Sequence, residues 1–319
     1  MIRMHLRAAD LAETSFAVSP VQETVFSLWV WRRPERQPFH LSWRRTVLPG
    51  WQSVDSEILA LMVAPGTGWV PDFLTPRPTG PFTDFGTELR AVAATPWRKV
   101  RADLEIAYRD DPLPAGLRGS PTALRDRVVA ALADYHRACI EPFWPRIRAV
   151  LEADIAYRAR RLAEAGARGL FSDLDWRVAW DDGWILIDRL ADLDHSIEID
   201  GRGLPLVPSL FVRGAVTYIS ADEPPIVVYP ARGRGAVWDT APPPVTDAVA
   251  QLLGPPRARL LALLREPATT TDLARRLGVT PSAVSQHLKV LHDARLVSRT
   301  QAGRSVLYLR SELADALVG

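Results

Sequence analysis

The chain has 319 residues, of which 47% are hydrophobic and 24% are charged, with a formal net charge of +2, an ordinary globular composition. This length exceeds what one hydrophobic core usually organises, so two or more domains are expected. One cysteine, Cys139, excludes an intramolecular disulfide, and no apolar run is long enough for a signal peptide or a membrane span, so we expect a soluble, cytoplasmic protein without membrane contact.

The first 166 residues are predicted to be mainly helical. Ser19 followed by Pro20 is a typical helix start, and apolar residues recur at helical spacing behind it. A final helix in this part should end near Gly166. In chain order we expect a short strand at 2–6, helices at 19–33 and 54–63, a proline-rich loop at 70–82, and a largely helical segment from 82 to 166.

The hydrophobic period then changes to that of strands. Two short apolar runs flank Asp182 and Gly183, which is a strong hairpin signal. Further short strands are expected at 196–200, 215–220 and 225–230. Together they predict an α+β fold, with helices first and a small antiparallel sheet after them. We place an N-terminal domain at 1–238, a proline-rich linker at 239–248 and a C-terminal domain at 249–319.

The charge is distributed unevenly between these segments. Residues 249–319 hold ten Lys and Arg against five Asp and Glu, whereas residues 1–248 hold 29 basic and 32 acidic side chains. All eleven tryptophans precede residue 240. A small basic segment joined to a larger acidic one suggests a module that binds a polyanion, although chance could produce such a difference.

The C-terminal segment carries the signals of a helix-turn-helix. An amphipathic helix at 255–267 precedes a second helix, in which Thr269 and Asp272 have the spacing of a capping box and Gly278 ends the helix. A third helix, Thr280–Leu296, opens on a threonine and a proline. Short helices joined by a glycine-containing turn are typical of this motif.

The third helix divides into two faces at about 100° per residue. One is an apolar stripe of Val284, Leu288 and Leu291, and His287 lies on its flank, where we expect packing or a backbone hydrogen bond. The opposite face can donate hydrogen bonds throughout, as a recognition helix does in a major groove, and the positive helix N-terminus adds attraction for phosphate. This face consists of Ser282, Ser285, Gln286 and Lys289.

Two strand-like runs, 295–300 and 305–310, follow this helix and predict a basic β-hairpin. Gly303 would occupy its turn, with Arg299 and Arg304 near the tip, where they suit phosphate or minor-groove contact. The whole is a winged helix-turn-helix. The predicted DNA contacts are Thr280, Ser282, Ser285, Gln286, Lys289, Arg299 and Arg304.

These residues resemble the winged-helix domain of the ArsR family of bacterial transcriptional regulators. The resemblance rests on "LLGPPRARLLALL", "TTTDLARRLGVTPSAVSQHLKVLHDARLV" and "GRSVLYLR", over about the last 70 residues. The first 240 residues are similar to an N-terminal extension of some actinobacterial members. The resemblance implies a cytoplasmic repressor that binds double-stranded DNA at an inverted-repeat operator as a homodimer, pairs through its flanking helices, and is released by a signal.

The chain departs from the metal-sensing members of that family. Their thiolate site lies in the helix corresponding to "TTDLARRLG", which here contains neither Cys nor His, and the C-terminal "SELADALVG" has no His for the family's other site. We therefore expect no metal site and no cofactor. The expected signal is a small organic molecule, or a partner protein, acting on residues 1–240.

Other candidate sites carry weaker signals. His136 and Cys139 could share a helix face as a sensing or metal site, although a lone cysteine is more often a buried apolar residue. The segment 192–200 has several possible metal ligands without EF-hand spacing, and 231–237 lacks a complete phosphate-binding fingerprint. No catalytic signature is present, so an enzyme is not expected. The tryptophans of the larger segment, Trp29, Trp31, Trp43, Trp51, Trp69, Trp176, Trp180 and Trp184, could line an apolar effector pocket, and most should be core.

Two classes of function remain open from the sequence. The first is a ligand-responsive DNA-binding repressor. The second is an enzyme or a protein-interaction domain with a winged helix as an accessory. The donor-rich outer face of the third helix and the basic wing favour the first class, because a winged helix kept for protein contact would more often expose apolar or acidic side chains.

Overall fold

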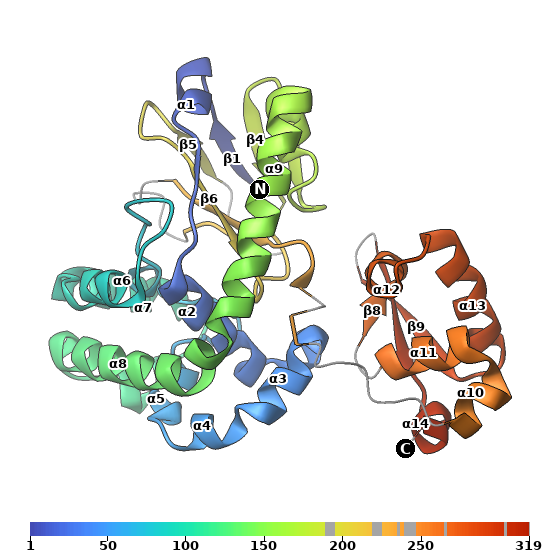
Figure 1. Ribbon diagram of the computed structural model, residues 1–319. Coiled ribbons are helices and arrows are strands. Elements are labelled where there is room, and N and C mark those ends of the chain that lie inside the picture. The colour runs from blue at the N-terminus through green and yellow to red at the C-terminus, as the bar shows by residue number, and fades with distance from the viewer. Residues whose placement is uncertain are drawn as a thin grey trace. The chain divides into compact units, whose positions relative to one another are not determined.

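A computed structural model describes residues 1–188, 195–218, 225–234, 237–238, 247–264, 267–302 and 305–318. The chain divides into two compact units (Figure 1). The N-terminal unit comprises Met1–Gln37 and Arg44–Arg232, and the C-terminal unit comprises Pro38–Trp43 and Gly233–Gly319. No helix in the described part of the chain is long and apolar enough to cross a membrane. The linker predicted at 239–248 lies largely outside the described residues.

Helices form most of the N-terminal unit, as expected. They are α1 (Ala8–Ala12), α2 (Pro20–Arg32), α4 (Leu48–Gln52), α5 (Ser56–Leu61), α6 (Phe85–Ala93), α7 (Trp97–Ala107), α8 (Pro121–Tyr135) and α9 (Trp144–Phe171), while α3 (Leu41–Thr46) crosses the division between the units. Ser19 caps α2 as predicted, because its hydroxyl accepts a hydrogen bond from the Gln22 amide at 3.1 Å. Helix α2 is buried along most of its length, and the polar side chains of Gln22 and Glu23 are buried with it.

The long regular part of α9 ends at the predicted glycine, because Ala165 and Gly166 both have non-helical backbone angles. Gly166 adopts a φ of +60° and interrupts the helix, which then continues to Phe171. Leu170 and Phe171 are buried in the core beneath the sheets. Burial of these two apolar side chains explains why the helix resumes, since local propensity alone favours a stop at glycine.

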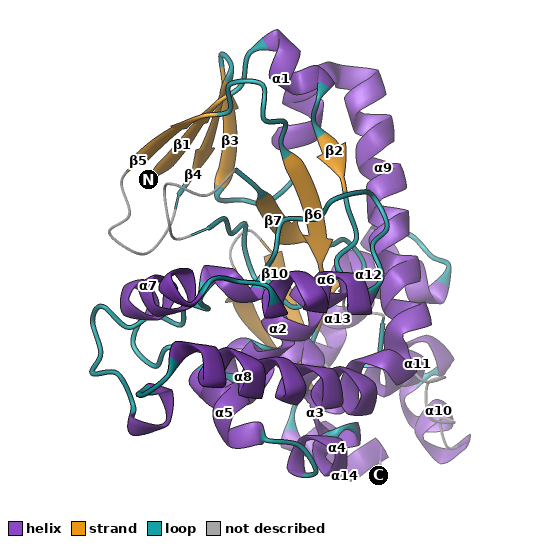
Figure 2. Cartoon of the chain, turned by 90° about the vertical axis from the view of Figure 1, so that its left-hand side faces the viewer, coloured by secondary structure: helices purple, strands orange, loops and turns teal. Residues whose placement is uncertain are grey.

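A four-stranded sheet contains the predicted hairpin. Its strand order is β3 (Val178–Asp181), β4 (Trp184–Ile187), β1 (Ile2–His5) and β5 (His195–Glu198). The hairpin turn has positive φ at both central residues, +38° at Asp182 and +85° at Gly183, which is the requirement of a type I′ turn. Strand β1 pairs antiparallel with β4 and parallel with β5, and Figure 2 shows it between them.

A second, three-stranded sheet is parallel throughout. It consists of β2 (Ser15–Phe16), β6 (Pro205–Ser209) and β7 (Val227–Pro230), with β6 in the middle (Figure 2). The α+β class is confirmed. The expectation of a single antiparallel sheet is wrong, because this second sheet is separate and its strands are parallel. Strand β6 was not predicted, because all five of its residues are buried and show no alternation. Within the predicted strand 215–220, Val216 forms only an isolated bridge with Val228, and residues 219–220 lie outside the described part.

One core cluster of the N-terminal unit joins both sheets to the end of α9. Its members come from sequence positions as distant as Ile2 and Tyr229. At about 25 cal/mol per Å² of apolar area removed from water, such burial is the main driving force for this arrangement. The buried side chains of this cluster are Ile2, Met4, Leu6, Leu170, Phe171, Leu174, Val178, Ile185, Ile187, Ile197, Ile199, Leu204, Leu206, Ala215, Val227 and Tyr229.

The described part of the C-terminal unit has the element order of a winged helix. Its elements are α10 (Asp247–Leu253), α11 (Pro255–Leu263), β8 (Ala268–Thr269), α12 (Thr270–Leu277), α13 (Pro281–Asp293), β9 (Val297–Ala302), β10 (Ser305–Arg310) and α14 (Glu312–Val318). The strands form an antiparallel sheet in the order β8-β10-β9. The unit also contains a hydrogen bond between two aromatic side chains, in which Trp238 Nε1 donates to His40 Nδ1 at 2.8 Å.

Candidate nucleic-acid interface

The turn between α12 and α13 is built from the capping residues that the sequence predicted. Thr269 caps α12, because its hydroxyl accepts from the Asp272 amide at 3.1 Å. Gly278 ends α12 in the left-handed conformation, with a φ of +67°. Thr280 then caps α13 by accepting from the Ala283 amide at 3.3 Å, and Pro281 occupies the first helical position. Side-chain and glycine chemistry therefore fixes the short connection between the two helices.

A buried apolar cluster holds α13 against the rest of this unit. The predicted stripe is confirmed, since Val284, Leu288 and Leu291 are each at most 1% exposed. They pack with residues of α11 and α12, including Leu260 and Leu273. Each fully buried leucine contributes about 1.5–3 kcal/mol relative to exposure. The apolar stripe thus determines which face of α13 remains outward.

The outward face of α13 carries the predicted donor side chains. Ser282, Ser285, Gln286 and Lys289 are all exposed, and so is the capping residue Thr280. The first turn of α13 contains no acidic side chain, so nothing offsets the partial positive charge of its N-terminus. His287 is half-buried on the flank of the stripe. This surface can donate hydrogen bonds to base edges and phosphates, although contact of each side chain with DNA stays a prediction.

The wing forms, but Arg299 does not lie near its tip. In the antiparallel register Arg299 of β9 faces Tyr308 of β10, and three more residue pairs, ending with Ala302 and Ser305, separate it from the turn. At about 3.3 Å per residue this is a displacement of roughly 10 Å. The reason is that the strands continue further toward the turn than the apolar residues alone indicated. Arg299 is exposed, whereas Gly303 and Arg304 lie outside the described residues.

Sequence reasoning did not single out two further exposed arginines of this motif. Arg275 lies in the last turn of α12, with its guanidinium 3.5 Å from the carboxylate of Asp272. Arg295 lies in the turn after α13 with a φ of +58°. Their contribution to the positive charge of residues 249–319 was visible in the sequence. Their exposure depends on the packing of the helices and could not be read there.

The His136 and Cys139 pair lies in the N-terminal unit and is buried. The Cys139 thiol is fully buried, which raises its pKa to about 12. Burial also lowers the pKa of His136 to about 4, and its Nδ1 is 2.9 Å from the hydroxyl of Thr24. A reactive thiol needs a lowered pKa and access to solvent, so this environment does not favour a sensing role.

The remaining candidate segments are only partly described. Residues 192–194 of the segment 192–200, and residues 235–236 of the segment 231–237, lie outside the described ranges. Within the described ranges no group of three or more His, Cys, Asp or Glu side chains is placed to hold a metal ion.

Comparisons with known proteins divide the chain in two. Residues 257–299 match the family described as "Bacterial regulatory protein, arsR family", and residues 94–235 match a family of unknown function. No solved structure matches the chain.

Two curated relatives match parts of the chain. The HTH-type transcriptional regulator NmtR of Mycobacterium tuberculosis is 42% identical over 65 residues, which cover 20% of this chain and 54% of the relative. A transcriptional repressor SmtB homolog of Synechocystis is 43% identical over 58 residues, covering 18% and 44%. The chain thus spans about half the length of these relatives. Its C-terminal segment is an ArsR-family helix-turn-helix domain, and it follows a domain that belongs to a family of unknown function.

Proposed function

We propose that this chain is a DNA-binding transcriptional repressor that acts as a homodimer and is released from its operator by a non-metal signal acting on the N-terminal unit. The observation that carries the proposal is the outward face of α13. Four donor side chains are exposed there above a fully buried apolar stripe, within a segment that matches the arsR family. Both curated relatives are described as transcriptional regulators or repressors, which supports the same class.

Base reading is assigned to Gln286 and Ser282 on this face. A glutamine side chain can pair with adenine through two hydrogen bonds, and each good pair of this kind contributes about 1–3 kcal/mol of discrimination. Arg299 and Arg304 of the wing supply contacts to phosphate, which position the protein without reading sequence. Thr280, Ser285 and Lys289 complete the contact set near the start of α13.

The homodimer is supported by two exposed leucines at the ends of the winged-helix segment. Leu252 on α10 is 69% exposed and Leu313 on α14 is 59% exposed. Both helices pack against α11. A recognition helix reads only a few base pairs, and pairing two of them about one turn of DNA apart provides the specificity that a genome requires.

A non-metal signal is supported by the chemistry of α12, α14 and Cys139. Helices α12 and α14 contain neither cysteine nor histidine, and Cys139, the one cysteine of the chain, is buried. One cysteine cannot build a soft-metal site of three or four sulfurs within one subunit. Titration of the DNA complex with Zn²⁺, Cd²⁺ and arsenite should therefore leave it intact. Stoichiometric release by one of these ions would contradict this part of the proposal.

The test of DNA binding starts from the sequences that the full-length protein retains from genomic fragments, which should share an inverted repeat. Fluorescence anisotropy on that repeat should then show that Gln286→Ala costs about 1–3 kcal/mol, with a smaller loss on random DNA. Gln52→Ala is the matched control, because Gln52 is an exposed glutamine on α4. An equal loss on both DNAs would reduce Gln286 to a backbone contact, and the absence of any retained sequence would refute the proposed function.

A further inference from the structure

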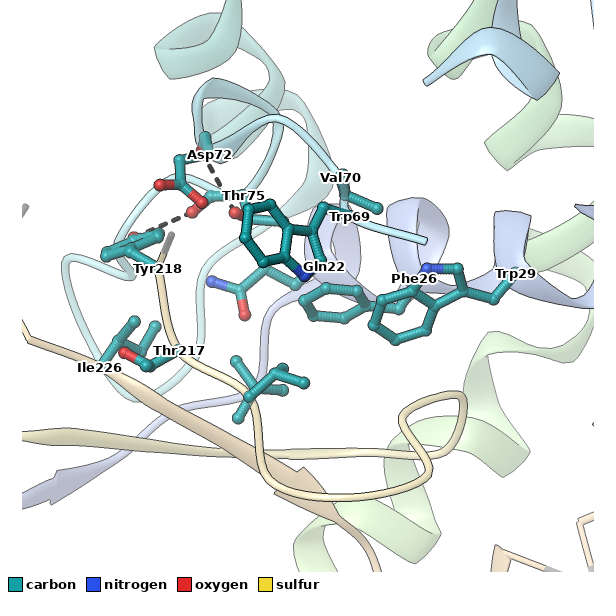
Figure 3. A pocket seen from close by; sticks show the side chains of 12 residues that line it. Gln22, Phe26, Trp29, Trp69, Val70, Asp72, Thr75, Thr217, Tyr218 and Ile226 are labelled. Atoms are coloured by element: carbon teal, nitrogen blue, oxygen red, sulfur yellow. Dashed lines mark hydrogen bonds between the residues drawn. The ribbon is translucent and has the colours of Figure 1, made fainter. Parts of the chain in front are cut away.

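A cavity of about 40 Å³ lies in the N-terminal unit, outside the winged helix (Figure 3). Three parts of the chain form its wall: α2, the segment from Trp69 to Thr75, and residues 216–218 together with 226–228. The volume is enough for about three water molecules, so only a small molecule fits it. Its lining side chains are Gln22, Phe26, Trp29, Trp69, Val70, Asp72, Thr75, Val216, Thr217, Tyr218, Ile226 and Val228.

Aromatic rings form much of this wall. Phe26 and Trp29 stack with their centroids 5.0 Å apart, and Trp29 Nε1 donates to the Gly68 carbonyl at 2.8 Å. Trp29 therefore has its polar group satisfied by the protein and offers the cavity a ring surface. Trp69 carries the Arg109 guanidinium 4.4 Å from its ring centroid. Such walls favour a flat apolar ligand, because stacked aromatic rings attract each other beyond the effect of their buried area.

One polar atom in the wall lacks a partner. Gln22 is 1% exposed, and its Nε2 donates to the Pro76 carbonyl at 3.0 Å, which fixes the orientation of the amide. Its Oε1 has no hydrogen-bond partner among the residues that the structure describes. Figure 3 shows this amide among the side chains around the cavity. A buried acceptor without a partner is unfavourable, and a donor on a bound molecule would remove this cost.

Neighbouring hydroxyl groups donate elsewhere. The Tyr218 hydroxyl donates to the Thr75 carbonyl at 2.9 Å, and the Thr75 hydroxyl donates to the Asp72 carbonyl at 3.1 Å. These bonds hold the wall in place, and they direct both protons away from Gln22. The cavity therefore offers a ligand one hydrogen-bond acceptor, Gln22 Oε1, among aromatic side chains.

We propose that this cavity binds a small uncharged aromatic molecule whose N–H or O–H group donates to Gln22 Oε1. Asp72 also lines the cavity, so a cationic ring compound is the competing class. Burial of a cation among apolar walls is costly unless the charge is closely paired, whereas a neutral donor satisfies Gln22 without that cost. The inference locates the effector site that the proposed function requires, and to that extent it rests on that function.

The test compares phenol with toluene, which has nearly the same shape and no hydrogen-bond donor. Ligand-observed NMR titrations of the full chain should give dissociation constants of about 1 mM for such fragments. Gln22→Met removes the acceptor, and we expect the ratio of phenol to toluene affinity to fall by about 5- to 10-fold, the range of one hydrogen bond. Gln37→Met is the matched control. Gln37 is also buried and donates to the Phe211 carbonyl at 2.9 Å, but it does not line the cavity.

A second readout needs no substitution of Gln22. In protein labelled with 5-fluorotryptophan, phenol should shift the ¹⁹F signals of Trp29 and Trp69 and leave that of Trp176, which does not line the cavity. Signals are assigned by single Trp→Phe variants. A shift confined to other tryptophans would overturn the inference even if Gln22→Met failed to fold.

The outcomes separate this inference from the proposed function. An unchanged phenol-to-toluene ratio in Gln22→Met, tighter binding of benzylammonium than of phenol, or no phenol binding would each overturn the cavity assignment while operator binding stood. Failure of the wild-type protein to bind any DNA would instead overturn the proposed function. The fragment titrations would still decide what the cavity binds.

Discussion

Replacement of Glu23 by glutamine should stabilise the N-terminal unit at neutral pH. Glu23 on α2 is 1% exposed, and burial raises the pKa of its carboxyl to about 8. Hydrogen bonds from Ser209 and from the Leu210 amide, the latter at 3.1 Å, oppose this rise only in part. The folded protein therefore holds a proton on Glu23 at pH 7, which the unfolded chain releases.

The magnitude follows from proton linkage. Between the unfolded pKa of 4.5 and the folded pKa of about 8, the folded state binds one more proton than the unfolded state. The stability contributed by Glu23 is complete below pH 4.5, and each pH unit above it lowers the free energy of unfolding by about 1.36 kcal/mol. At pH 7.5 the wild-type protein has lost on the order of 4 kcal/mol through this group.

Glutamine avoids this loss because it does not titrate. Its carbonyl can accept the bonds from Ser209 and Leu210, and its NH₂ group takes the place of Oε1, which has no hydrogen-bond partner in the described structure. The stability of Glu23→Gln relative to the wild type should thus increase progressively from pH 4.5 to pH 8. Glu88→Gln should show a shorter rise that ends near pH 7, since the pKa of Glu88 is raised only to about 7.

The assay is urea unfolding of the full chain at several values between pH 4 and 8, monitored by tryptophan fluorescence. All eleven tryptophans precede residue 240, so the signal comes mainly from the larger part of the chain. Differences between variant and wild type cancel the titration of all other groups. A difference that stays constant across this range, or a Glu23→Gln protein that is less stable than wild type at pH 7.5, would refute the reasoning.

Four further predictions concern the cap, the wing, the dimer and acid stability. Thr280→Ala should lower stability by about 1 kcal/mol, measured by thermal unfolding of the winged helix, because it removes the cap of α13. Arg304→Ala should weaken binding to all DNA about equally and reduce the log–log salt slope by about one, measured by anisotropy at several salt concentrations. Leu252→Asp should convert dimers to monomers in light scattering and weaken operator binding. A wild-type protein that is monomeric with and without DNA would contradict the proposed dimer. Because burial lowers the pKa of His136 from 6.5 to about 4, stability should fall as pH drops through that interval, and His136→Gln should lessen the fall in the same urea assay.

The sequence by itself determined the helix-turn-helix. Thr269, Gly278 and Thr280 act on backbone groups within a few residues of themselves, and the apolar stripe of α13 follows from helical spacing. The hairpin at Asp182 and Gly183 was also specified by adjacent residues, since both adopt the positive φ that its turn requires. Each of these features depends on interactions over short sequence distances, which the order of residues encodes directly.

Only the tertiary structure decided the features that join distant parts of the chain. Ile2 pairs with Ile187 and His195, and no local pattern specifies which strand receives β1. The cavity around Gln22 likewise exists only because α2, the 69–75 segment and β7 converge, and the sequence could indicate the tryptophans without indicating which of them share a wall. Such contacts form when the gain from burying apolar surface exceeds the entropy lost in closing long loops, and that balance is a property of the whole fold.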